Sequence, residues 1–193
     1  MNAPAWQPVL DFWFLTPEQP GHGRPRAEWF RKDPAFDAAI RDRFGALIEV
    51  ALAGGLREWD VDERGALARV ILLDQFTRNV FRDTPRAFAG DPLALAAALA
   101  MIDAGRDRAL APVERGFVYL PLEHAEDRAL QERCVALYEA LGRETGSPGA
   151  AEWAIRHRDI VARFGRFPHR NRILGRESTA EEIEFLKQPG SGF

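Results

Sequence analysis

One basic stretch of the sequence carries residue types suited to holding an anion. Residues 163–176, RFGRFPHRNRILGR, contain five arginines and one histidine and no acid, although the chain has a net charge of −3. Guanidinium groups bind carboxylates and phosphates through two parallel hydrogen bonds. His169, Arg170 and Asn171 offer several donors on consecutive positions. We therefore predict an anion site here, to which Arg166 adds a further guanidinium.

Other roles for the same stretch are structural. Cations such as Arg163 and Arg166 are favoured beside the free carbonyls at the end of the preceding helix. The acids of residues 177–182 could form surface pairs with the later arginines, Arg172 and Arg176. A loop that neutralises a buried acid, Asp74 or Glu123, is the main alternative to an anion site.

A second polar group interrupts the apolar segment VILLDQFTRN, residues 70–79. Asp74 and Arg78 are four positions apart and therefore lie on one face of a helix. Gln75 and Asn79 add two amides, so that the four side chains could line a cleft and bind the same ligand. The alternative is an internal ion pair between Asp74 and Arg78 that fixes helix packing.

Two more helical segments place ionisable side chains among apolar ones. A helix that begins near Pro121 would put Glu123 on the buried stripe, with His124 on the adjacent track. A buried carboxyl can act as a general acid or base, so Glu123 and His124 are the candidate catalytic residues. His157 shares a face with Trp153 and later apolar residues, and we count it as a binding residue. The alternative for each is a satisfied core side chain.

The helices that would position these groups are marked at their ends. Aspartate–proline pairs at 33–34 and 91–92 predict helix starts, and Gly165 predicts a helix end. Two capping boxes are expected: Asp60 with Glu63, and Ser178 with Glu181. No segment alternates in the manner of a strand. The sequence thus predicts one all-α domain over residues 1–193, a stack of antiparallel helical hairpins.

Composition excludes several classes of protein. The apolar share of 46% and charged share of 28% are those of a globular domain. A pI of about 5.9 argues against nucleic-acid binding. The single cysteine allows no intramolecular disulfide. The uncharged run Leu93–Ile102 is too short to span a membrane, and the N-terminus lacks the pattern of a secretory signal. We expect a cytoplasmic protein that binds neither nucleic acid nor membrane.

No metal or cofactor is predicted. His124, His157 and His169 could join Glu123 in a metal site, but their spacing carries no ligand signature. A nucleophile elbow, a phosphate-binding loop and a dinucleotide fingerprint are also absent from the sequence. The oligomeric state is not predicted.

Four segments together resemble the bacterial domain of unknown function 924 family. They are VLDFWF at 9–14, LLDQFTRNVFR at 72–82, YLPLEHAED at 119–127 and RFGRFPHRNRILGREST at 163–179. The resemblance spans nearly the whole chain and implies an all-helical, tetratricopeptide-like fold, with no assigned reaction. Thr77 departs from the pattern, in which proline is common. The resemblance marks these positions: Asp74, Gln75, Arg78, Asn79, Glu123, His124, His169, Arg170 and Asn171.

We predict from these features a helical protein that binds an anionic small molecule or an acidic peptide group in a polar cleft. An acid–base enzyme using the same cleft is one alternative, with Glu123 or His124 as general base and Arg170 as electrostatic stabiliser. A protein-interaction scaffold is the other alternative, because stacks of helical hairpins often present binding surfaces.

Overall fold

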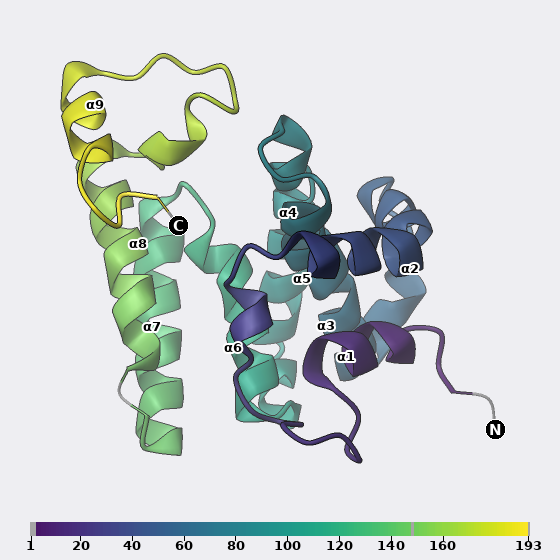
Figure 1. Cartoon of the computed structure of the whole chain (residues 1–193). Coiled ribbons are helices and arrows are strands. Elements are labelled where there is room, and N and C mark those ends of the chain that lie inside the picture. Colours follow the sequence, from purple (N-terminus) through teal and green to yellow (C-terminus); the bar gives the residue numbers. More distant parts are fainter. Residues whose placement is uncertain (1–2, 148, 193) are drawn as a thin grey trace. The chain divides into compact units, whose positions relative to one another are not determined.

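The computed structural model describes residues 3–147 and 149–192, and every regular element within these ranges is helical (Figure 1). The all-α prediction is therefore confirmed. The α-helices are α1 (Gln7–Phe14), α2 (Pro34–Leu52), α3 (Glu63–Val70), α4 (Thr77–Val80), α5 (Asp91–Asp103), α6 (Pro112–Glu123), α7 (Arg128–Thr145), α8 (Ala150–Phe164) and α9 (Ala180–Leu186). A π-helical turn, η3 (Ile71–Phe76), joins α3 to α4, and short 3-10 turns lie elsewhere.

Contacts divide the described chain into two compact units. The first unit runs to Arg82 and continues over Arg86–Pro121, and the second comprises Asp83–Pro85 and the described residues from Leu122 onward. The predicted residues of segment 70–79 lie in the first unit, and those at 123–124, 157 and 166–171 lie in the second. The expectation of one domain over the whole chain stays a prediction.

The first unit has an aromatic core. Trp13 of α1 is fully buried, and its ring centroid lies 5.9 Å from that of Trp29, 5.5 Å from Phe76 and 5.6 Å from Phe117. The run from α3 through the π-helical turn into α4 is buried almost throughout, as its apolar pattern predicts, and the turn packs against α2 and α5. This core holds the polar residues of segment 70–79 in place.

The second unit is built on a helical hairpin. Figure 1 shows α7 and α8 side by side, and they contact each other along their length, because the chain reverses between Thr145 and Ala150. An apolar cluster of Ile160, Val161 and Phe167 continues this core beyond the end of α8. The predicted antiparallel pairing is confirmed for this hairpin, whereas the tetratricopeptide-like character stays a prediction.

Several helix ends lie where the sequence places them. The Asp33 side chain accepts hydrogen bonds from the amides of Ala35 (2.9 Å) and Phe36 (3.2 Å), which caps α2. Gly165 ends α8 in the left-handed conformation, with φ of 70°. The second aspartate–proline pair also lies at a helix start but one position further in, because Asp91 is the first residue of α5 and the preceding glycine is its N-cap.

Other boundaries differ from the prediction. Asp62, not Asp60, caps α3, because a 3-10 turn occupies Arg57–Val61. The last helix has a capping box, but Thr179 and Glu182 form it instead of Ser178 and Glu181. At both places a second suitable cap residue lies close to the predicted one.

The expected faces of two helices also need correction. Pro121 lies inside α6, which ends at Glu123, so no helix begins near Pro121. Trp153 is 55% exposed on α8, although the apolar spacing placed it on the buried face with His157. Trp153 instead stacks with Arg156, whose guanidinium carbon lies 5.0 Å from the ring centroid.

Among the residues that the structure describes, one segment passes a simple test for a membrane span. Pro85–Asp103 is long and apolar enough by length and composition, with a mean hydropathy of 1.2. Core helices of water-soluble proteins pass the same test, so a single such segment is weak evidence. The expectations of a cytoplasmic location and of no membrane binding stay predictions.

Candidate functional site

The polar residues of segment 70–79 lie in the first unit, on the π-helical turn and α4. Asp74 is fully buried, and its Oδ1 lies 3.0 Å from a guanidinium nitrogen of Arg78. Arg78 also donates to both carboxylate oxygens of Asp91, at 2.9 and 3.1 Å. The Gln75 side chain donates to the Asp74 carboxylate. Arg78 thus joins the π-helical turn to the start of α5.

Asn79 belongs to a second polar contact in the same unit. Its Nδ2 donates to Asp37 Oδ1 at 2.7 Å, and Arg82 Nε donates to Asp37 Oδ2 at 2.6 Å. Asp37 and Asn79 are both buried. The polar residues of segment 70–79 therefore have partners within their own unit, the arrangement that the internal ion-pair alternative predicts.

Other predicted residues gather in the second unit around the ring of Phe167. Ring centroids of His157 and His169 lie 5.5 and 5.7 Å from it, and the Arg170 guanidinium carbon lies 4.6 Å above it. His124 is the next neighbour of His157, at 6.3 Å. We call these five residues, together with Glu123, the Phe167 cluster.

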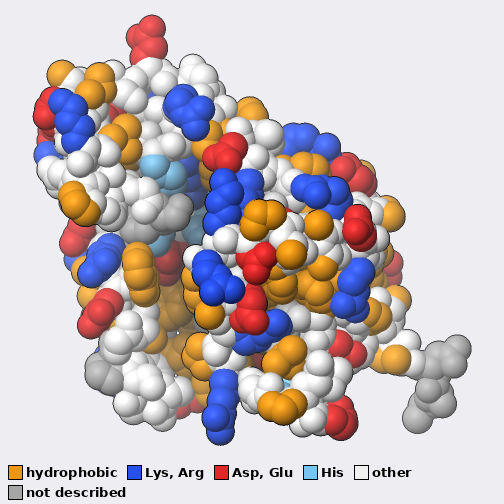
Figure 2. Space-filling view, in the orientation of Figure 1, with side chains coloured by type: hydrophobic (Ala, Val, Ile, Leu, Met, Phe, Trp, Pro, Cys, Tyr) orange, Lys and Arg blue, Asp and Glu red, His pale blue; other side chains and the backbone are white. Residues whose placement is uncertain are grey.

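The Phe167 cluster has an accessible side and a buried side. His124 and His169 are partly exposed, whereas the other members of the cluster, Arg170 included, are buried. Figure 2 shows histidine side chains at the surface, in the part of the view where Figure 1 places α8 and the segments after it.

The tautomer of His157 is set by its neighbours. Its Nδ1 lies 2.9 Å from the carbonyl oxygen of Trp153 and 3.2 Å from Oε1 of Glu123. A carbonyl oxygen only accepts, so Nδ1 carries the proton and Nε2 is the basic nitrogen. Burial lowers the pKa of His157 to about 3, and positive charge on His124 and Arg170 acts in the same direction. The ring is therefore neutral at neutral pH.

The pKa of His169 is also lowered. Burial lowers its pKa to about 4, the charge of Arg170 acts in the same direction, and the Glu126 carboxylate opposes both. At neutral pH the Phe167 cluster thus contains two neutral imidazoles beside a permanent guanidinium charge.

Arg166 and Asn171, the remaining predicted residues, have partners near α9. Arg166 donates to both carboxylate oxygens of Glu182, at 2.7 and 2.8 Å, and Asn171 Nδ2 donates to Ser178 Oγ at 3.0 Å. The hydrogen bonds from Arg166 lower the pKa of Glu182 to about 2. These two residues hold the C-terminal segment together, and we do not place them in the ligand site.

Two residues that the sequence did not single out support the Phe167 cluster. Glu126 accepts the Phe167 amide at 2.8 Å and two hydrogen bonds from Arg176, at 2.6 and 2.9 Å. Gln131 donates to the carbonyl of Glu123 at 2.6 Å and to two more carbonyls, one in the last turn of α6 and one just after it. Glu126 lies within the segment YLPLEHAED, but nothing in the sequence indicates its distant partners.

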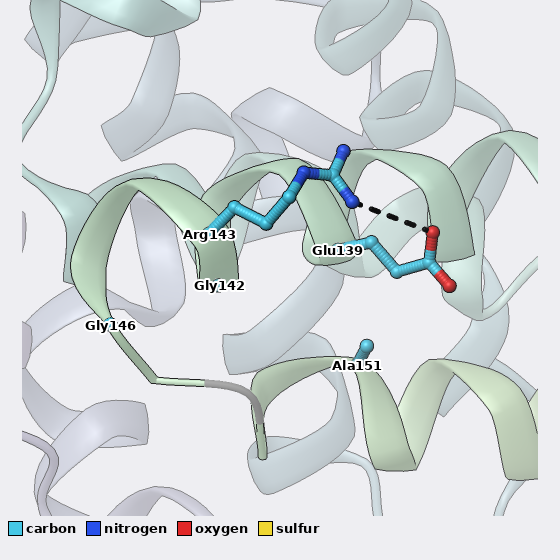
Figure 3. A pocket seen from close by; sticks show the side chains of 5 residues that line it. All are labelled: Glu139, Gly142, Arg143, Gly146 and Ala151. Carbon is cyan, nitrogen blue, oxygen red and sulfur yellow. Dashed lines mark ion pairs between the residues drawn. The ribbon is translucent and has the colours of Figure 1, made fainter.

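A shallow pocket of about 450 Å³ opens at the turn between α7 and α8 (Figure 3). Its lining includes Glu139, Gly142, Arg143, Gly146 and Ala151, and the Arg143–Glu139 pair spans 3.9 Å at the exposed surface. None of the described lining residues is a predicted site residue. Within the described ranges, no group of three or more histidine, cysteine or acidic side chains is placed to hold a metal ion.

Comparison with known proteins places the chain in a family. The family described as "Bacterial protein of unknown function (DUF924)" matches residues 9–190. The chain belongs to this family. The resemblance seen in the four motifs is therefore confirmed, and the match includes residues of both units.

A structure of another protein of unknown function, from Agrobacterium tumefaciens, supports the same assignment. It is 41% identical in sequence to this DUF924 chain, with a TM-score of 0.83, and the similarity covers 95% of this chain and 97% of the other. No curated protein matches the chain. Membership of the family therefore supports the fold and assigns no activity to the chain.

Proposed function

We propose that the Phe167 cluster of this DUF924 protein binds an anionic small molecule or an acidic peptide group. The observation that carries the proposal is the gathering of His157, His169 and Arg170 around the ring of Phe167, with the ring of His124 next to that of His157. Imidazole N–H groups and a guanidinium donate to the oxygens of carboxylates and phosphates. The partial exposure of His124 and His169 supports access from solvent.

The proposal is narrower than the one from sequence. Arg166 and Asn171 donate to Glu182 and Ser178, and Arg78 donates to Asp91 in the first unit. The proposed ligand contacts are therefore His124, His169 and Arg170, with His157 behind them. The Glu123 carboxylate lies against His157 and repels an anion, so we place the anion beside His169 and Arg170.

A binding experiment with an arginine control tests the proposal. Sulfate, inorganic phosphate and acetate would be titrated into the protein by calorimetry, with Arg170→Gln as the test variant. Arg143→Gln is the matched control, because it makes the same charge change on the same unit at a side chain that is 72% exposed. We expect binding that Arg170→Gln weakens at least about tenfold and Arg143→Gln leaves unchanged.

Circular dichroism of both variants separates loss of binding from loss of folding. Equal weakening in the two variants would mean that net charge alone attracts the anion. Absence of binding by all three anions would contradict the proposed site.

An acid–base enzyme is the second candidate, and the contacts of His157 favour it. A histidine whose Nδ1–H is held by a carbonyl and a carboxylate presents Nε2 as a proton acceptor in a fixed direction. A base with a pKa of about 3 is weak at neutral pH, and for this reason we rank binding first.

A screen of ester and phosphoester substrates tests the enzyme candidate. An activity that His157→Gln and Glu123→Gln remove would support it, provided that His22→Gln retains the activity. His22 lies in the first unit, where its exposed side chain contacts the Leu15 carbonyl, so it serves as the histidine control. An activity that persists in His157→Gln would exclude His157 as the base.

A further inference from the structure

We propose that anion binding at the Phe167 cluster is coupled to uptake of a proton by His169, so that the protein binds anions more tightly in acid. This inference rests on the anion-binding function proposed above and adds its regulation. It also restricts the ligand class to anions that present an acceptor oxygen to a protonated imidazole.

The first support is the set of charged groups that face His169. They come from different elements: Arg170 beside it on the turn Pro168–Arg170, His124 and Glu126 from the connection between α6 and α7, and Arg176 from the segment before α9. Arg176 holds Glu126 through two hydrogen bonds, at 2.6 and 2.9 Å. The remaining groups in this set are cationic or become cationic on protonation.

The second support is the physical origin of the neutral state. Burial disfavours a charge on His169, and Arg170 repels one, so both causes keep its pKa at about 4. An anion beside Arg170 and His169 would replace repulsion by attraction and favour the protonated ring. Binding and protonation then promote each other, because linkage between two sites is reciprocal.

The arrangement of the rings indicates His169 as the proton acceptor. His169 and His157 lie on the same aromatic ring, with centroids 5.7 and 5.5 Å from that of Phe167. His157 is buried, and its Nδ1 faces the Trp153 carbonyl and Glu123, whereas His169 is partly exposed. An anion that enters from solvent therefore meets His169 before His157.

Sulfate is a suitable probe because it keeps both charges throughout the range from about pH 7.5 to about pH 5.5, where phosphate titrates. Its affinity would be measured by calorimetry at several pH values, in pairs of buffers with different heats of ionisation. We expect the affinity to rise as the pH is lowered, by up to about tenfold for each pH unit, with uptake of up to about one proton per site. Ring resonances of His169 in the unmodified protein would show its pKa rising when sulfate is added.

Variants identify the proton acceptor. His169→Gln should bind sulfate with an affinity that no longer depends on pH, and His22→Gln should behave as the unmodified protein. If His169→Gln is poorly folded by circular dichroism, the ring resonances of the unmodified protein decide the question alone.

The inference and the proposed function fail in different ways. Sulfate binding that is independent of pH, or a pH dependence that persists in His169→Gln, overturns the inference and leaves the anion site standing. Absence of sulfate and phosphate binding at every pH overturns the anion site and the inference with it. A rise of the His169 pKa with sulfate, lost in Arg170→Gln, supports both.

Discussion

Acidification should destabilise the second unit through His157. The pKa of this side chain falls from an ordinary value of 6.5 to about 3 on folding, chiefly because of burial. Between these values the unfolded chain binds a proton that the folded chain does not. Stability is therefore complete above the unfolded pKa and is lost as the pH falls toward the folded pKa.

The size of the loss can be worked out from the same values. A pH of about 5 lies about 1.5 units below the pKa of this side chain in the unfolded chain. Each unit corresponds to about 1.4 kcal/mol in the free energy of unfolding. The folded protein should then lose about 2 kcal/mol relative to neutral pH from His157 alone. Glu182 adds little in this range, because its pKa of about 2 and the ordinary value of 4.5 both lie below it.

Urea unfolding of the unmodified protein and His157→Gln at about pH 7 and about pH 5 measures this loss. The difference in free energy of unfolding between the two proteins should shrink by about 2 kcal/mol on acidification. In thermal unfolding the same change corresponds to about 4–8 °C in melting temperature. Hydrogen exchange of the α8 amides would locate the effect in the second unit. Because the test compares pH dependences, a constant destabilisation by the substitution cancels.

An equal dependence on pH in the two proteins would refute this reasoning. A His157 ring that titrates near its ordinary pKa by NMR would refute it independently. His22→Gln should behave like the unmodified protein in both experiments.

Two substitutions test the packing of the π-helical turn. Gly90→Ala should cost about 1–3 kcal/mol in urea unfolding, because its Cβ would lie 2.1 Å from a carbonyl oxygen of the turn. Gly45→Ala in α2 is its control and should stabilise by up to about 1 kcal/mol, since its Cβ meets nothing within 4 Å; a similar loss in both would show that steric contact is not the cause. Arg78→Ala should cost about 3–5 kcal/mol by leaving a buried carboxylate without its cation. Arg86→Ala removes an exposed pair and should cost at most about 1 kcal/mol, and equal costs would contradict the buried-pair explanation.

The fold was predictable where one residue type admits one local solution. Asp33 before a proline and Gly165 after an apolar turn are examples, and both lie where the sequence places them. Thr179 shows the limit, because it and Ser178 are both good caps and only the packing of the last helix chooses between them. Trp153 fits the apolar spacing of α8 but is 55% exposed, since periodicity does not say how far a neighbouring helix covers a face.

The sequence predicted which residue types make up the candidate site, but it did not predict which acid pairs with which arginine. Surface pairs of the acids at 177–182 were expected with Arg172 and Arg176. The acids Glu181 and Glu182 pair instead with Arg163 and Arg166, which were expected beside the end of α8. Arg176 binds Glu126, fifty residues earlier in the chain. Sequence spacing predicts partners within one helix, whereas contacts across a loop depend on how the chain returns.

The π-helical turn at Ile71–Phe76 sets the rotational phase of α4 relative to α3. A π-helical turn holds one residue more than an α-helical turn, and each residue rotates a helix by about 100°. Removing one residue there would restore α-helical geometry and turn Arg78 and Asn79 away from Asp91 and Asp37 together. The turn therefore determines which side chains of α4 face α2 and α5. A one-residue deletion here should destabilise the protein far more than a one-residue deletion in an exposed loop.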